Sequence, residues 1–392
     1  MAANRAYLDH NATSPLRLAA RAAMSAALEA GGNGSSVHAE GRAARARIET
    51  ARGQIAHALG ATPNSITFAS GATEANTLAL SPIIETGGQT RSFDVLMISA
   101  VEHPSVRSGG RFPADKIELI PVNGEGLVDI EALETTLAAH RKAGRRMLVS
   151  VMAANNETGA LQPLAGIALA VHEAGGMLHS DAVQIAGKLP FDLEASGADL
   201  ISISSHKLGG PQGAGALIVR SEGFRVPPLL RGGGQESGRR AGTENVAAIA
   251  GFGAAIDEAE SNLARETVRQ RKLRDMTERG IREIAPDTII LSEAAERLPN
   301  TICFAAPGVP AETAVIAFDL DGVALSAGAA CSSGKVGPSE TLKAMGVSPE
   351  IAKSAVRLSI GWDTNEERIS HFLEAWKRVY DKLGRDRRIR AA

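Results

Sequence analysis

The chain has 392 residues, of which 44% are hydrophobic and 22% are charged, and its formal net charge is -2. This balance is typical of a folded globular protein and excludes a disordered chain, and the near-zero charge argues against a dedicated nucleic-acid binder. The sequence has no apolar run close to the roughly 18 residues that cross a bilayer, and its N-terminus lacks the apolar stretch of a signal peptide. We therefore expect a cytoplasmic protein that contacts neither nucleic acid nor membrane.

Short apolar runs alternate with helical patterns between residues 66 and 219, and the helical patterns lie at 74–84, 130–137 and 167–173. Because the apolar runs are continuous, they predict a mostly parallel sheet covered on both faces, in a large α/β domain of residues 15–260. Ligands of such sheets bind beyond the carboxyl ends of the strands. The expected strands are 66–68, 95–99, 117–122, 147–152, 177–179, 200–204 and 216–219.

The pattern changes near residue 260, and we predict a smaller α+β domain that also includes the N-terminus, from residues 1–14 and 261–392. Its last helix is expected to begin at Thr364, because Glu367 three residues later completes a capping-box pattern. The basic tail that follows is typical of a solvated chain end. Before this helix we expect helices at 262–284 and 312–319 and strands at 301–305 and 357–360.

One lysine, Lys207, lies between an apolar strand and a glycine-rich loop, in the segment SISSHKLGGPQGAGAL. This places it at a strand end, where the ligand crevice of the sheet is expected. Partial burial there favours the neutral amine, which is a nucleophile and forms Schiff bases with carbonyl compounds. Taken alone, the residue is equally compatible with a phosphate-binding or merely exposed lysine.

Three further segments are expected at the same sheet edge as Lys207. Asp181 in SDAVQ ends a strand, where a carboxylate can pair with a pyridinium nitrogen or simply cap a helix. In SGATEAN, Ala72 and Thr73 open a helix whose free N–H groups suit a phosphate, although such turns are common. His103 in AVEHPS can stack on an aromatic ring or move a proton, or serve as a structural histidine. Their shared location favours one site.

The two cysteines allow at most one disulfide, and they are too few for a cysteine-based structural metal site, so we expect no metal. Cys303 lies in TICFAA, which is typical of a buried strand in which cysteine acts as a small hydrophobe. Cys331 lies in SAGAACSSGKVGPS, which is too rich in glycine and serine for a core. By itself this segment could also be a surface connection with an incidental cysteine.

The ordered motifs of the chain resemble those of the cysteine desulfurases, which are pyridoxal phosphate (PLP) enzymes of the class V aminotransferase branch of fold type I. The resemblance extends from Tyr7 to the final helix and is strongest to the group that serves nitrogen fixation and iron–sulfur cluster assembly. It implies a large PLP-binding domain with a mostly parallel sheet and a smaller domain that carries the active-site cysteine. The matching motifs are YLDHNAT, GNGSSVHAEGRAAR, SGATEAN, VEH, NNETG, SDAVQ, SSHKLGGPQGAGAL, RRAGTEN, GAACSSG and VRLSIG.

The resemblance implies a role for each matching residue. Lys207 is similar to the lysine that binds PLP as a Schiff base, His103 to the histidine that stacks on the ring, and Cys331 to the nucleophile that accepts sulfur. The departures from the family pattern, such as Asn76-Thr77 after GATE, touch neither Lys207 nor Asp181 nor Cys331. The other implied contacts are Asp181 with the pyridinium nitrogen, Gln184 with the phenolic oxygen, Ala72, Thr73, Ser204 and His206 with the phosphate, Thr243 with the phosphate of the neighbouring subunit, and Asn156 and Arg357 with the substrate carboxylate.

The implied activity is the removal of sulfur from L-cysteine, which yields L-alanine and a persulfide on Cys331. The implied partners are a second copy of the chain, in a homodimer, and an iron–sulfur scaffold or other sulfur acceptor. Two other functions remain open. A selenocysteine lyase or a class V aminotransferase would keep Lys207 and Asp181 without needing Cys331, and a non-catalytic scaffold would keep the fold but bind little cofactor.

Overall fold

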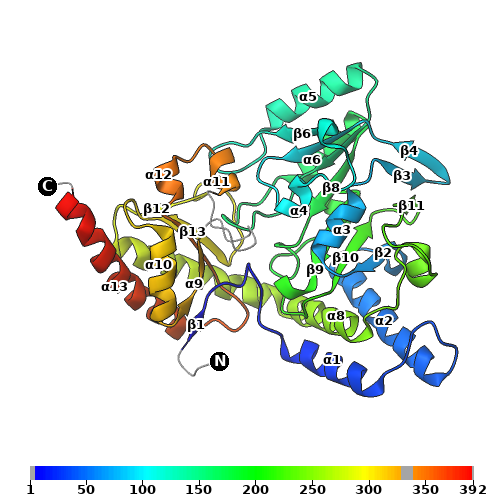
Figure 1. Ribbon diagram of the computed structural model, residues 1–392, viewed down its shortest axis with the longest axis horizontal. Coiled ribbons are helices and arrows are strands. Elements are labelled where there is room, and N and C mark those ends of the chain that lie inside the picture. The colour runs from blue at the N-terminus through cyan, green and yellow to red at the C-terminus, as the bar shows by residue number, and fades with distance from the viewer. Residues whose placement is uncertain (1–4, 328–338, 391–392) are drawn as a thin grey trace.

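The computed structural model describes residues 5–327 and 339–390, with the backbone alone for 384–390. A larger part of the molecule is built around a central sheet, and a smaller part contains the C-terminal helices and the N-terminal strand (Figure 1). None of the helices in the described ranges is long and apolar enough to span a membrane. Cys331 lies outside the described residues.

The central sheet has seven strands, and each of them covers one of the seven apolar runs expected from the sequence. Only β10 runs antiparallel to its neighbours, and the other adjacent pairs are parallel. The prediction of a mostly parallel sheet is therefore confirmed, although β6 and β7 end two residues before their expected ends. In spatial order the strands are β2 (Ile66–Ala69), β10 (Gly215–Val219), β9 (Leu200–Ser204), β8 (Met177–Asp181), β7 (Met147–Ser150), β5 (Val95–Ser99) and β6 (Ile117–Ile120).

Both faces of this sheet are covered, which explains the continuous apolar runs. Alternate residues of β5 belong to different cores, because successive side chains of a strand point to opposite faces: Met97 packs in one core and Ile98 in the other. The first core is covered by α2 (Ala39–Ala58), α5 (Ile130–Lys142), α6 (Leu164–Glu173) and α8 (Val246–Ser261), and the second by α3 (Ala72–Ala79) and α4 (Pro104–Arg107).

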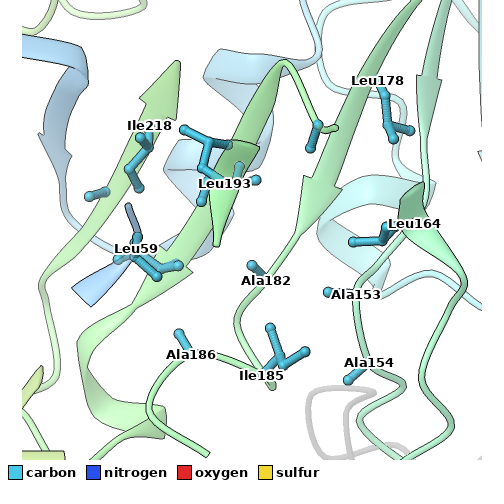
Figure 2. Packing of buried hydrophobic residues seen from close by; sticks show 14 of the residues in the cluster. Leu59, Ala153, Ala154, Leu164, Leu178, Ala182, Ile185, Ala186, Leu193 and Ile218 are labelled. Atoms are coloured by element: carbon cyan, nitrogen blue, oxygen red, sulfur yellow. The ribbon is translucent and has the colours of Figure 1, made fainter. Parts of the chain in front are cut away.

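Small residues follow the carboxyl ends of the middle strands. Ala153 and Ala154 come after β7, and Ala182 and Ala186 come after β8, all packed in the first core (Figure 2). Their short side chains let the loops beyond the strands pack closely against one another. The loops that follow β7 and β8 are therefore closely packed at the carboxyl ends of the strands.

The predicted helix at 74–84 is wrong beyond Ala79, where α3 ends. The apolar pair Ile83 and Ile84, which completed the helical pattern, instead begins β3 (Ile83–Thr86). This strand pairs with β4 (Gln89–Ser92) and β11 (Phe224–Arg225) in a small antiparallel sheet at the margin of the large part. Pairing across the turn after β3 therefore overrides the helical periodicity of this segment.

The smaller part contains a second, antiparallel sheet of four strands in the order β12 (Ile289–Ile290), β13 (Thr301–Ala305), β16 (Ala355–Ser359) and β15 (Ser326–Ala327). Its residues share one core with α9 (Leu263–Ile284), α10 (Ala311–Leu320) and α13 (Glu366–Arg390). The N-terminal strand β1 (Ala6–Tyr7) pairs with β14 (Val323–Ala324), so the first residues join this part. The domain boundaries at residues 15 and 260 stay a prediction.

The start of the last helix differs by two residues from the prediction. Helix α13 begins at Glu366, and the side chain of Asn365 accepts a hydrogen bond from the N–H of Arg368 at 3.0 Å. The hydroxyl oxygen of Thr364 accepts instead from the N–H of Gly361 at 3.0 Å. The predicted capping box from Thr364 is therefore wrong, because Asn365 provides the cap.

Candidate active site

A cavity of about 520 Å³ lies beyond the carboxyl ends of β2, β5, β7, β8 and β9. This is the edge at which an open parallel sheet binds its ligands. Most of the predicted site residues line this one cavity although they come from distant parts of the chain. They are Ala72, Thr73, His103, Asn156, Asp181, Gln184, Ser204, His206 and Lys207.

Lys207 lies in a short 3-10 turn, Ser205–Lys207, directly after β9. Its Nζ donates hydrogen bonds to the carbonyl oxygens of Asn11 at 2.6 Å and of Ala12 at 2.8 Å. The N-terminal segment therefore crosses the cavity beside the amine and holds it in place. An amine in this position can react with a carbonyl compound in the cavity.

Asp181 ends β8, and its side chain is buried against two donors. Its Oδ1 accepts from the N–H of Val183 at 3.0 Å, and its Oδ2 accepts from the side-chain amide of Asn76 at 2.8 Å. Asn76 also donates to the hydroxyl of Ser105 at 2.9 Å and is fully buried. Asn76 was not among the predicted site residues, although it lies on α3 one turn beyond Ala72 and on the same helix face.

His103 caps α4, and its Nδ1 accepts from the N–H of Ser105 at 3.2 Å. The residue before it, Glu102, is buried below the loop, and one of its carboxylate oxygens accepts from the N–H of Met152 at 2.6 Å. Burial, and secondarily the charge of Asp181, raise the pKa of Glu102 well above its usual value. Glu102 therefore supports the His103 loop through its hydrogen bond with the Met152 backbone.

The end of the cavity next to α3 has donors suited to an anion. Ala72 and Thr73 are in the first turn of this helix, whose N–H groups have no partner within the helix. Ser204 and His206 face the same cavity. Burial, together with the charges of Lys207 and Lys188, lowers the pKa of His206 to about 4, so its ring is neutral near pH 7.

Arg357 does not line the cavity but lies behind it, fully buried in β16. Its Nη1 donates to the carbonyl oxygen of Asn156 at 3.0 Å, and its Nη2 to Oδ1 of Asp9 at 2.8 Å. Arg357 is opposite Cys303 on the neighbouring strand, so both side chains share the sheet face that packs toward the cavity loops. Asp9, which the sequence analysis missed, thus holds one side of the guanidinium.

Cys331 lies outside the described residues, but two serines that precede and follow the undescribed residues 328–338 form hydrogen bonds beside this site. Before the segment, the hydroxyl of Ser326 donates to Oδ2 of Asp9 at 2.8 Å. After it, the hydroxyl of Ser339 donates to the buried carboxylate of Glu157 at 2.6 Å. Asp9 contacts Arg357, and Glu157 follows Asn156 in the chain, so both attachments adjoin predicted substrate contacts.

Thr243, like Arg357, is a predicted site residue that does not line the first cavity. It lines a second cavity of about 230 Å³, and Ser70 and Gly213 line both this cavity and the first. The loop before Thr243 turns through Glu236, which has a left-handed backbone and forms a bidentate, buried ion pair with Arg52 at 2.7 and 2.8 Å. Within one chain, Thr243 therefore borders the cavity from outside.

Comparison with known proteins gives a consistent family assignment. A model of the aminotransferase class-V family matches residues 6–372. A cysteine desulfurase IscS from Dictyoglomus turgidum is 38% identical over 384 residues, which are 96% of this chain and 95% of that protein. A cysteine desulfurase from Cereibacter sphaeroides is 40% identical, over 97% of this chain and 96% of its own length.

Solved structures agree with the sequence relatives. A NifS-like protein from Rickettsia africae superposes with a TM-score of 0.86 at 38% identity, over 96% of this chain and 99% of that chain. The apo structure of a cysteine desulfurase from Thermococcus onnurineus has a TM-score of 0.81 at 23% identity, over 97% and 95% of the two chains, a likeness that concerns the fold alone.

Proposed function

The chain belongs to the class-V aminotransferase family and has its fold-type I architecture, and from this premise we propose that it is a cysteine desulfurase. The reaction converts L-cysteine to L-alanine and leaves the sulfur as a persulfide on Cys331. One observation carries the proposal: Lys207, Asp181 and His103 face a single cavity, beside which Ser326 and Ser339 form hydrogen bonds with Asp9 and Glu157.

The residues present fit pyridoxal phosphate, the cofactor of this family. The cavity has an amine in Lys207, a carboxylate in Asp181 for the ring nitrogen, and a group of donors for a phosphate at the start of α3. When bound, the cofactor supplies an electron sink for the charge left on the substrate carbon. We propose that Lys207 holds it covalently, with Gln184 on its phenolic oxygen and His103 on its ring face.

The substrate carboxylate is bound by Asn156 and by the guanidinium of Arg357, which Asp9 keeps oriented. Once the substrate amine has taken its place on the cofactor, the freed amine of Lys207 would take the proton from the substrate α-carbon, since it lies in the cavity. The Cys331 thiolate then attacks the substrate sulfur and forms an S–S bond, while the C–S bond breaks and leaves its electron pair on the carbon skeleton. That carbon takes up a proton, and the product leaves as alanine.

The protein is further proposed to act as a cytoplasmic homodimer that passes the persulfide sulfur to an iron–sulfur scaffold or another acceptor. Thr243 supports the dimer, because it borders the cavity of its own chain from outside and is expected to reach the phosphate of the neighbouring subunit. Replacing Thr243 by valine should weaken PLP binding while light scattering still gives a dimer mass. Unchanged PLP affinity would remove this role.

The sharpest test is mass spectrometry of the protein after exposure to L-cysteine. One additional sulfur is expected on Cys331 and none on Cys303, because burial raises the pKa of the Cys303 thiol to about 12 and its side chain is inaccessible. The Cys331→Ser variant should lose sulfide release while it keeps the visible absorbance of the cofactor. Unchanged turnover in that variant would indicate a selenocysteine lyase or an aminotransferase, and a colourless protein that takes up no PLP would indicate a non-catalytic scaffold.

A further inference from the structure

A second lysine, Lys188, is buried behind the cavity. It follows β8 at the end of the turn that starts from Asp181, and only 7% of its surface is exposed. Its Nζ donates to the side-chain oxygen of Gln184 at 2.6 Å and to the side-chain oxygen of Asn11 at 2.9 Å. The hydroxyl of Thr267 in α9 donates to its carbonyl oxygen at 3.2 Å, which fixes the backbone. Lysine is almost never buried in this way without a charged partner.

The surroundings of Lys188 provide no counter-charge. In residues 5–327 and 339–390 it forms no ion pair, and the charged groups that face it are Lys207 and Arg357, which are both cations. Burial, and then these two cations, lower the pKa of Lys188 well below its usual value. An apolar side chain of similar length would fill the same space without this cost, so packing alone does not explain a lysine here.

The contact with Lys188 determines which way the Gln184 amide points. Because Nζ of Lys188 donates to it at 2.6 Å, the amide oxygen of Gln184 faces Lys188. The amide nitrogen is then on the other side, where it donates to the carbonyl oxygen of Asn11 at 3.0 Å. Its second hydrogen is available to an acceptor in the cavity, which Gln184 lines.

Asn11 links the two lysines. Its carbonyl oxygen accepts from Nζ of Lys207 and from the Gln184 amide, and its side-chain oxygen accepts from Nζ of Lys188. Asn11 is fully buried, and its side-chain nitrogen donates to the hydroxyl of Thr301 at 2.9 Å. Asn11 therefore connects Lys188 with Lys207, while Lys188 contacts Gln184 directly.

We propose that Lys188 is a positioning residue, which holds the Gln184 amide with its N–H directed at the phenolic oxygen of bound pyridoxal phosphate. The inference rests on the proposed function, because Gln184 is assigned to that oxygen there. Without the donor on Lys188, the Gln184 amide is free to turn over and to place its oxygen against the cofactor oxygen. Two acceptors then face each other, and the cofactor is held less tightly.

The test compares two variants in the absence of cysteine. Lys188→Met removes the donor and keeps the length of the side chain, whereas Lys188→Gln keeps a donor but carries no charge. In Lys188→Met we expect the dissociation constant for PLP to rise about 10-fold to 100-fold, the loss expected for one hydrogen bond to a charged oxygen. The pH midpoint of the visible absorbance should rise by about 1 unit, because the phenolic oxygen has lost a donor. Lys188→Gln should recover most of both changes.

A double-variant cycle separates positioning from simple structural support. In a Gln184→Ala background, Lys188→Met should cause no further change in PLP affinity or in the absorbance midpoint. A structural role would instead lower the thermal stability of the apoprotein in both Lys188 variants and leave the midpoint where it was. That result, or an effect of Lys188→Met that persists without Gln184, overturns the inference. Failure of the unmodified protein to bind PLP would overturn the proposed function instead.

Discussion

The two sides of the cavity hold their functional residues in different ways. On the central-sheet side, Lys207 and His103 belong to short turns directly after β9 and β5, and both face the cavity. On the small-sheet side, Arg357 lies in the middle of β16, is fully buried and reaches the site through Asp9 and the backbone of Asn156. The functional side chains on the central-sheet side therefore lie in turns, whereas Arg357 on the small-sheet side is also part of the buried core.

This difference predicts how each side tolerates substitution. A turn side chain that faces a cavity can be shortened without opening the packed layers beneath it. A buried cation cannot be removed without leaving its anionic partner in a poorly solvated place. Substitutions on the central-sheet side should therefore lower activity without lowering the unfolding free energy. Substitutions on the small-sheet side should lower both together.

The largest expected effect on activity is that of Lys207→Ala, which removes the proposed amine from the cavity. We expect cysteine turnover to fall by about 10³-fold or more, because both the covalent link and the proton transfer are lost. The unfolding free energy should change by no more than about 1 kcal/mol, since the lost hydrogen bonds end on backbone carbonyls near an open cavity. Lys116→Ala, at an exposed lysine, is the control for both measurements. A global loss of stability in Lys207→Ala would contradict the proposed separation.

Arg357→Ala should change both properties together. Substrate binding should weaken, which appears as a higher KM, and the unfolding free energy should fall by about 3–5 kcal/mol because Asp9 loses its buried partner. Arg378→Ala is the matched control, since its pair with Asp321 is exposed and should contribute about 0–1 kcal/mol. Adding Asp9→Asn to Arg357→Ala should recover part of the stability but none of the substrate binding. Equal stability losses at Arg357 and Arg378 would remove the contrast between the two sides.

Much of the fold could be predicted from sequence, and the exceptions have physical reasons. Strands buried on both faces are continuous apolar runs, so all seven strands of the central sheet were found. The β3–β4 pair was missed because the segment after Ile84 is polar and largely exposed, and because Ile83 and Ile84 continued a helical pattern. The β3–β4 pair forms through hydrogen bonds across a turn, and a pattern of apolar residues does not indicate such bonds.

The predictability of the site follows the same division. Lys207, Asp181 and His103 were found because each follows a strand, and strand ends of a parallel sheet meet at one edge. The buried partners Asn76 and Lys188 were missed because their contacts join residues far apart in the chain. Asn76 meets a residue 105 positions away, and Lys188 meets one 177 positions away. These long-range contacts follow from the tertiary fold, although Lys188 also contacts Gln184 only four positions away.

A smaller effect should come from the interior of the central sheet. His179 lies fully buried between the hydroxyls of Ser150 and Ser202 at 2.8 and 3.0 Å, and burial lowers its pKa to about 3. In the unfolded chain the pKa of His179 is near 6.5, so the unfolded chain binds the proton more readily than the folded protein. The contribution of the neutral ring to the unfolding free energy is therefore fully present above about pH 6.5 and is lost as the pH falls toward 3. This histidine should contribute up to about 1.4 kcal/mol of lost stability for each pH unit in that window.

The measurement for His179 is denaturant unfolding of the apoprotein at several pH values between 7.5 and 4. His179→Gln should lower the unfolding free energy at pH 7.5. It should also make that free energy less dependent on pH, because about one proton fewer is taken up on unfolding. Ser150→Ala removes one hydrogen bond and no ionisable group, so it should lower the stability while the pH dependence that comes from His179 remains. An unchanged pH dependence in His179→Gln would show that the buried ring does not remain neutral. Water would then reach the interior of the central sheet more easily than the burial of His179 indicates.

The smallest expected effect tests the order of the last helix in the smaller part. Asn365→Ala should cost about 1 kcal/mol, because the N–H of Arg368 in the first turn of α13 loses its acceptor. Hydrogen exchange can locate the loss: Asn365→Ala should speed exchange at Arg368, whereas Thr364→Val should speed exchange at Gly361. Faster exchange at Arg368 in Thr364→Val, and not in Asn365→Ala, would instead show that Thr364 caps the helix as the sequence predicted. Because α13 packs in the same core as β16, a loss confined to its first turn would also show that the support of Arg357 comes from the core rather than from the helix end.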